Sequence, residues 1–272
     1  AVIENDYLPP LVSAGVLAPI DYRNVPNFKN LSVNFRDLAF DPGNRYSVPN
    51  QWGTVGILVR SDRVTRPVTR WADLWDSQYV GKVALRRQPR ELIGAALKGL
   101  GHSLNSKDPM QIAAAHQRVA ELARGAIFVA DETRAGVDQF LASSAVVMVA
   151  WSGDALYARE RGAQVEYILP VEGAMIWQDN YVISAHSSHR RMAETFINFL
   201  LRPEIAARCV NLNYYPTANE AANAFIRPEL LNDPNVYPPS DVIEKAEWFP
   251  PINPVSNRLY AQILEELRAT GR

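Results

Sequence analysis

AVVMVAWSGDALYARERG, residues 145–162, decides the fold class. Its first seven residues form an unbroken apolar run of strand length, which is typical of a strand covered on both faces of its sheet. Ser152, Gly153 and Asp154 then open a stretch with helical spacing. A strand that continues directly into a helix predicts an α/β architecture. Trp151 closes the strand, so we expect it at the crevice where α/β proteins bind ligands.

The rest of the chain repeats this alternation of strands and helices. Short β-rich runs stand at 57–61, 82–85 and 126–130. Asp108 is a typical N-cap followed by proline, and Gly125 ends the helix that Asp108 begins. Apolar residues recur at helical spacing in 90–104, and Gly101 is expected to close that helix. Together with 152–162, the other predicted helices span 108–125, 189–201, 203–212 and 257–271.

Composition limits the possible functions. The net charge of the 272 residues is −1, so there is no basic excess for binding nucleic acid. No apolar run approaches the roughly 20 residues that span a bilayer. Cys209 is the single cysteine, so no intrachain disulfide forms. The chain begins at Ala1 on a strand-like stretch with no signal peptide, and we expect that an N-terminal segment is missing.

The sequence contains no motif for catalysis or metal binding. His186 and His189 lie in a polar turn without a neighbouring carboxylate or thiolate, which favours solvated side chains over a metal site. Cys209 lies within a helical pattern and is expected to be a buried small apolar residue. No phosphate loop, nucleophile elbow or zinc-protease motif occurs. We therefore predict a protein that is not an enzyme and uses neither a cofactor nor a metal.

Aromatic residues at the ends of predicted elements are the positive signal. In AMIWQDNYVISA, residues 174–185, Trp177 and Asp179 are two apart, so their side chains share one face of an extended strand. An indole ring beside a carboxylate suits an ammonium group. The alternative is a strand end where the ring packs and the carboxylate caps a turn. An aromatic-lined cleft is predicted by these two residues together with Trp52, Trp151, Tyr214 and Tyr215.

Several stretches, in this order, resemble the periplasmic spermidine/putrescine-binding proteins of bacterial ABC importers. They cover nearly the whole chain: YSVPNQWGTVGILV, TRWADLWDSQYVGKVAL, PRELIGAALKGLGHSLNSKDP, VVMVAWSGDA, VEGAMIWQDNYVI, INFLLRPEIAARCV, YYPTANEAA, RPELLNDPNVYPP and the closing LRATGR. The resemblance implies the two-lobed α/β fold of type II periplasmic binding proteins, with a mixed sheet flanked by helices in each lobe and the ligand cleft between the lobes. It also implies that the chain lacks the N-terminal segment that family members carry.

The domain division, location and partners follow from the same resemblance. Residues 1–55 and 179–223 would form an incomplete N-terminal lobe, and residues 56–178 and 224–272 the C-terminal lobe. The protein would be periplasmic, or an extracytoplasmic lipoprotein, and a monomer. It would pass its ligand to the permease subunits of an importer.

Five residues match ligand-binding positions of the family. Trp151 and Trp177 match tryptophans that pack against the methylene chain of a polyamine. Asp179 matches a carboxylate that binds an amine, and Glu91 matches an acid near the other amine group. Tyr215 matches a tyrosine of the pocket.

The chain also departs from the family pattern. Gln88 stands where the family has a further acid, which argues against a ligand with three firmly held charges. Asp6 and Tyr7 occupy a segment in which the family has Ser or Thr and then Tyr. Gln88, Asp6 and Tyr7 are included among the candidate ligand contacts. Glu4, together with Asp6, would restore acidity near the site.

A small cationic amine such as putrescine or spermidine is therefore the predicted ligand. An amino-acid-like zwitterion is an alternative, with Arg86 or Arg87 as the partner of its carboxylate. Ferric iron is another, because the adjacent Tyr214 and Tyr215 offer hard oxygen ligands. A ligand-sensing subunit of the same fold would show the same sequence features.

Overall fold

The computed structural model describes residues 1–270 and divides them into two compact units. Unit 1 comprises Ala1–Gly53, Trp177–Tyr237 and Phe249–Asn253, and unit 2 comprises Thr54–Ile176, Pro238–Trp248 and the segment from Pro254 onward. Two long strands belong to both units, β2 (Ser47–Arg60) and β7 (Met175–Val182). Two of the boundaries between the units therefore fall inside strands, and the chain passes between the units several times, so the sequence shows no single linker.

Two segments that were expected in the second lobe, residues 224–237 and Phe249–Asn253, belong to unit 1. In the first of these segments, the backbone N–H of Arg227 donates to Asn211 Oδ1 at 3.0 Å, and Asn211 Nδ2 donates to the Phe225 carbonyl at 3.2 Å. Ile226 and Leu230 are buried there. These contacts hold the segment against the helix that ends at Asn213.

Unit 1 contains β1 (Val2–Glu4), which pairs antiparallel with β7. Its core joins Val48 of β2 to Ile183 after β7 and to Ile197 and Leu201 from the helical layer. Its α-helices are α1 (Leu8–Ser13), α6 (Arg190–Leu200), α7 (Pro203–Asn213) and α8 (Pro228–Leu231). Its short 3-10 helices are Asn5–Tyr7, Tyr22–Asn24, Pro26–Asn30, Val33–Phe35, Pro42–Asn44 and Glu220–Phe225.

Unit 2 contains a mixed sheet in which β2 pairs antiparallel with β5 and β6, while β3 pairs parallel with β5 and β4. β8 pairs parallel with the start of β7. The strands are β3 (Val83–Leu85), β4 (Ile127–Phe128), β5 (Val147–Trp151), β6 (Val165–Ile168) and β8 (Glu247–Trp248).

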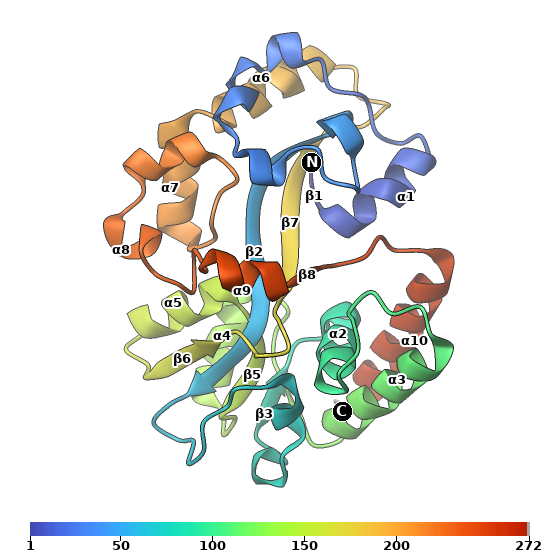
Figure 1. The fold of residues 1–272 in the computed structure, drawn as a ribbon, viewed down its shortest axis with the longest axis vertical. Coiled ribbons are helices and arrows are strands. Elements are labelled where there is room, and N and C mark those ends of the chain that lie inside the picture. The colour runs from blue at the N-terminus through green and yellow to red at the C-terminus, as the bar shows by residue number, and fades with distance from the viewer. Residues whose placement is uncertain (271–272) are drawn as a thin grey trace. The chain divides into compact units, whose positions relative to one another are not determined.

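The helices of unit 2 cover this sheet. Val137 and Phe140 of α4 pack on Met148 of β5, as does Ala155 of α5. Figure 1 shows α2, α3 and α10 side by side. The helices are α2 (Pro89–Gly99), α3 (Pro109–Ala123), α4 (Thr133–Ala142), α5 (Ser152–Glu160), α9 (Ser240–Lys245) and α10 (Pro254–Thr270), with 3-10 turns η6 (Trp71–Trp75) and η7 (Ser77–Tyr79). None of these described helices, nor those of unit 1, has the length and apolar composition needed to cross a bilayer.

The predicted helices and strands are present, but their first and last residues differ from the predicted ones. Asp108 caps α3 as expected, because its Oδ1 accepts from Met110 N at 2.8 Å. Gly101, which was expected to close the helix that begins near residue 90, adopts φ +79° just beyond α2, which ends at Gly99. β2 is much longer than the expected 57–61, because its first half bonds to the segment after α7, where Trp52 N donates to the Pro216 carbonyl. The predicted helix end at 271 lies outside the described residues.

Candidate ligand-binding site

In unit 1, β7 carries polar groups on both of its faces. Gln178 and Asn180 are fully buried and bond to each other, with Gln178 Nε2 donating to Asn180 Oδ1 at 2.8 Å. Gln178 N also donates to Asn5 Oδ1 at 2.9 Å. These bonds tie the two amides to each other and to Asn5, although Gln178 Oε1 is buried without a hydrogen-bond partner among the described residues. The alternate residues, Trp177 and Asp179, share the other face, as the two-residue spacing predicts.

The indole of Trp177 lies directly against backbone. A Cβ added to Gly53 of β2 would stand 2.5 Å from Trp177 Cζ2, so only glycine leaves room for the ring. The ring of Tyr215 meets the indole edge to face, with centroids 5.2 Å apart and planes at 72°. Trp177 Nε1 is buried and has no hydrogen-bond acceptor among the described residues. Two aromatic side chains therefore line the face on which Asp179 stands.

The carboxylate of Asp179 lies opposite another acid. The register of β1 against β7 pairs Glu4 with Asp179. Burial, and then the charge of Glu4, raises the pKa of Asp179 to about 6. No ion pair or hydrogen bond to the Asp179 side chain occurs within residues 1–270. The carboxyl group of Asp179 is thus partly buried, and a cation bound beside it would stabilise its charged form.

Two neighbouring candidates differ in accessibility. Asp6 is fully buried, and its backbone carbonyl accepts from Ile252 N at 3.0 Å. Tyr7 is 48% exposed at the start of α1. Burial and the charge of Glu4 raise the pKa of Tyr7. Tyr7 is therefore open to a ligand, whereas Asp6 belongs to the interior of unit 1.

In unit 2, Glu91 and Trp151 form a second carboxylate–indole pair. Trp151 Nε1 donates to Glu91 Oε1 at 2.7 Å. Glu91 lies in the first turn of α2, where the helix dipole favours a negative charge. The neighbouring Gln88 is only the N-cap position of α2 and makes no capping bond through its side chain.

Arg86 holds Trp151 in place. Its guanidinium lies 4.2 Å from the centroid of the indole and donates to both carboxylate oxygens of Asp154, at 2.7 and 3.1 Å. Asp154 Oδ2 also accepts from Trp151 N at 2.8 Å. Burial raises the pKa of Asp154, and the Arg86 guanidinium acts against that rise. This buried network was not predicted, because it depends on contacts between segments far apart in the sequence.

The expectation that Arg86 serves as partner for a ligand carboxylate is therefore wrong. Its side chain is 1% exposed and its charge is matched by Asp154. Arg87 differs: its guanidinium lies 4.5 Å from the centroid of Phe128, and its backbone N–H donates to Asp131 Oδ1.

The remaining aromatic candidates of unit 1 have packing contacts. Trp52 is buried against Phe35, with ring centroids 5.0 Å apart, and against Tyr237 at 6.5 Å. Tyr214 has φ +67° as the C-cap of α7, and the Arg227 guanidinium lies 5.9 Å from its ring. Tyr214 and Tyr215 thus contact different partners. In residues 1–270 no group of three or more His, Cys, Asp or Glu side chains is arranged to hold a metal ion.

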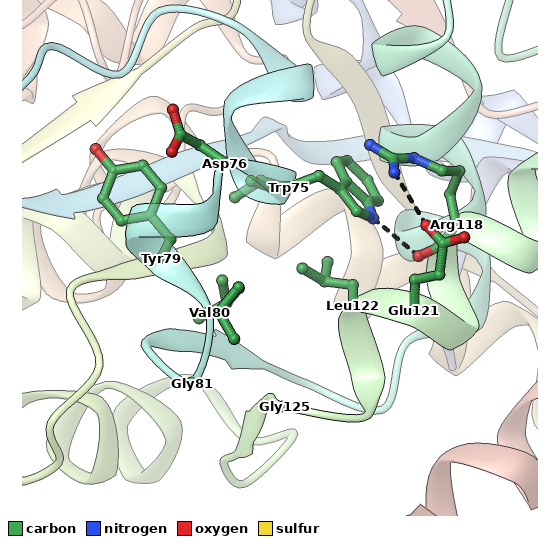
Figure 2. A pocket seen from close by; sticks show the side chains of 11 residues that line it. Trp75, Asp76, Tyr79, Val80, Gly81, Arg118, Glu121, Leu122 and Gly125 are labelled. Carbon is green, nitrogen blue, oxygen red and sulfur yellow. Dashed lines mark hydrogen bonds and ion pairs between the residues drawn. The ribbon is translucent and has the colours of Figure 1, made fainter.

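A cavity of about 210 Å³ lies elsewhere in unit 2, lined by η6, η7 and α3 (Figure 2). Trp75 Nε1 donates to the Arg118 carbonyl at 2.9 Å, and Arg118 Nη1 donates to Glu121 Oε2 at 2.9 Å. None of the predicted ligand residues lines this cavity. The charges of Arg118 and Glu121 at this cavity are therefore paired with each other.

Comparison with known proteins identifies the class. The model of the bacterial extracellular solute-binding protein family matches residues 1–236. A solved structure from Listeria monocytogenes has a TM-score of 0.90 at 30% identity, covering 98% of this chain and 83% of that one. The chain belongs to the family of bacterial extracellular solute-binding proteins. The expected fold class, an α/β periplasmic binding protein of type II, is confirmed by such neighbours.

Several similar proteins are named for polyamine binding. The spermidine/putrescine-binding periplasmic protein of Escherichia coli (strain K12) is 34% identical over 265 residues, which cover 97% of this chain and 75% of that protein. A putrescine/agmatine-binding protein of Pseudomonas aeruginosa is 34% identical over 256 residues, covering 87% and 69%. A spermidine/putrescine ABC transporter substrate-binding protein of Streptococcus pneumoniae has a TM-score of 0.83 at 28% identity, covering 100% and 84%.

Proposed function

We propose that this chain binds a small diamine or polyamine, such as putrescine or spermidine, and delivers it to the permease subunits of an ABC importer. The observation that carries the proposal is the face of β7 in unit 1. There the partly buried carboxyl group of Asp179, which pairs with no cation among residues 1–270, stands beside the Trp177–Tyr215 aromatic pair. A carboxylate binds the ammonium group, and aromatic rings pack against the methylene chain.

The second carboxylate–indole pair supports the same ligand class. Glu91 accepts a hydrogen bond from Trp151, while the positive charge of Arg86 is matched by Asp154. Asp179 of unit 1 and Glu91 of unit 2 are the carboxylates that we assign to ammonium groups. Charge-assisted hydrogen bonds contribute about 1.5 to 3 kcal/mol each. Cation–π contacts contribute about 0.5 to 2 kcal/mol each.

Two contacts of each kind would contribute about 4 to 10 kcal/mol before the free energy of ordering the ligand is subtracted. Micromolar binding corresponds to roughly 8 kcal/mol, so apolar burial of the methylene chain has to supply part of the affinity. In this proposal the protein catalyses no reaction, lies outside the cytoplasm and is a monomer. A zwitterionic ligand receives no support from Arg86, which Asp154 already engages.

Isothermal titration with putrescine, spermidine and γ-aminobutyrate tests the proposal on the full chain. Asp179→Asn should weaken amine binding at least tenfold, because it removes about 1.5 to 3 kcal/mol of charge-assisted bonding. Asp241→Asn, at an exposed carboxylate of α9, is the matched control and should bind as the unsubstituted chain does. Binding of γ-aminobutyrate alone, or no loss in Asp179→Asn, would contradict the proposal.

A further inference from the structure

Helix α6 has two apolar faces, and the core of unit 1 covers one of them. Ala193 and Ile197 pack into that core. Met192, Phe196 and Phe199 are 70%, 59% and 43% exposed, and their spacing of four and then three residues places them together on another face of the helix. A helix that only covered the core would need a single apolar stripe. The second stripe therefore faces away from the core.

The exposed stripe is a contiguous surface. Met192 lies one turn before Phe196 on the same face of α6. The rings of Phe196 and Phe199 are stacked, with centroids 6.4 Å apart and planes at 16°. The Arg202 guanidinium lies 5.7 Å from the Phe199 centroid. Contiguous exposed apolar surface marks an interaction site, whereas single exposed apolar residues do not.

The exposed positions of α6 carry positive charge and no carboxylate. Arg190 and Arg191 are exposed in the first turn and form no ion pair among residues 1–270. Glu194, the one acidic residue of this helix, is buried, and its carboxylate oxygens accept from Asp21 N at 2.9 Å and from Asn24 Nδ2 at 2.6 Å. Cations at a helix N-terminus oppose the helix dipole, so an anionic partner would stabilise this end of α6.

We propose that the α6 patch, formed by Arg190, Arg191, Met192, Phe196 and Phe199, binds the surface of a bilayer that contains anionic phospholipid. In such contacts the apolar side chains of an amphipathic helix enter the boundary between headgroups and acyl chains, while its arginines contact anionic headgroups. The helix lies along the membrane surface and does not cross it. No residue of the patch belongs to the proposed amine site, so the inference goes beyond the proposed function.

A second copy of the chain fits this surface less well than a bilayer does. A stable dimer buries roughly 800 Å² and about 20 to 30 residues on each partner. The apolar part of the α6 patch has three side chains. In a two-fold dimer the patch meets itself, and since it carries no carboxylate, it offers the arginines of its copy no opposite charge. A bilayer needs only shallow insertion and supplies many negative charges at once.

Sedimentation of the full chain with protein-free vesicles tests the inference. Vesicles of phosphatidylcholine alone are compared with vesicles of equal parts phosphatidylcholine and phosphatidylglycerol. At about 0.1 M salt the chain should bind the anionic vesicles at least tenfold more tightly, since each arginine near an anionic surface strengthens binding about fivefold. At about 1 M salt the Debye length falls from about 10 Å to about 3 Å, and most of that difference should disappear.

A matched pair of methionine variants tests the apolar part of the patch. Met192→Gln should weaken binding to the anionic vesicles about threefold to tenfold, because it removes apolar area that would enter the bilayer. Met110→Gln changes an 81% exposed methionine of α3 in unit 2 and should leave vesicle binding unchanged.

A matched pair of double variants tests the charge. Arg190→Gln with Arg191→Gln should remove most of the preference for anionic vesicles. Arg124→Gln with Arg258→Gln makes the same change in net charge at exposed positions of unit 2 and should keep that preference. Circular dichroism verifies that each variant folds.

Three results would overturn the inference. The first is that the chain binds neither kind of vesicle, which would leave the α6 patch to a protein partner. The second is that each α6 variant binds vesicles as its control does. The third is a dimer in sedimentation velocity that Phe196→Gln dissociates, since the patch is then an interface between copies. If the chain binds anionic vesicles through α6 but no amine, this inference stands and the proposed function falls.

Discussion

Gly53→Ala is the most direct test of the aromatic wall in unit 1. The new Cβ would stand 2.5 Å from Cζ2, 2.9 Å from Cε2 and 3.2 Å from Nε1 of Trp177. An ordinary contact begins at 3.4 Å, so the ring must shift by about 1 Å. The backbone of Gly53 does not require a positive φ. The effect of the substitution is therefore steric, with no added backbone strain.

The expected magnitude follows from that displacement. Overpacking of a filled site costs about 1 to 3 kcal/mol of unfolding free energy. The shifted indole also loses its edge-to-face contact with Tyr215, which contributes about 0.5 to 1.5 kcal/mol. We expect putrescine affinity to fall about tenfold, because a loss of 1.4 kcal/mol of binding free energy corresponds to that factor.

Urea unfolding measures the stability, and isothermal titration measures the affinity. Gly125→Ala is the matched control, since its Cβ would meet Gly81 N at 3.4 Å, an ordinary contact, without a positive φ. If Gly53→Ala has the stability and affinity of the unsubstituted chain, the steric argument is refuted. If stability falls and affinity does not, Trp177 is a packing residue and not part of the ligand site.

Two further predictions concern unit 2. Arg86→Met should lower the free energy of unfolding in urea by about 3 to 5 kcal/mol, because it leaves the buried carboxylate of Asp154 without its partner. The double variant with Asp154→Leu should recover most of that loss. A double variant as unstable as the single one would contradict the pairing. Burial acts to raise the pKa of Glu247, but hydrogen bonds from Lys98 and Ser103 outweigh it and lower the pKa to about 2. Since the folded pKa lies below the unfolded value of about 4.5, the stabilisation is complete above about pH 4.5 and disappears as the pH falls towards 2. In Glu247→Gln, the free energy of unfolding should therefore fall by about 1 to 2 kcal/mol less over this pH range than in the unsubstituted chain, allowing for solvent screening. An unchanged dependence of stability on pH would argue against the ion pair.

Local chemistry made much of the fold predictable. The continuous apolar run of β5 and the helical spacing after Trp151 predicted a strand followed by a helix, which is what β5 and α5 form. Asp108 and Gly101 were identified from capping and turn preferences that act within a few residues. Trp177 and Asp179 share one face because alternation along a strand is a local property of extended backbone. Each of these features depends on neighbours in the chain.

Contacts between distant segments could not be predicted in the same way. The pairing of Glu4 with Asp179 depends on the register of β1 against β7, and a shift of one residue would place Glu4 on the opposite face. Arg86 seemed available to a ligand from its position after β3, yet its guanidinium is buried against Asp154.

The sequence by itself therefore determined the class of fold and the residue types of the ligand site, because apolar periodicity and i, i+2 alternation are set by backbone geometry. The tertiary structure alone decided which charges stand together. Those charges interact through space, and their spacing is set by strand register and by the packing of helices on the sheet. The raised pKa of Asp179 and the matched charge of Arg86 are properties of that packing.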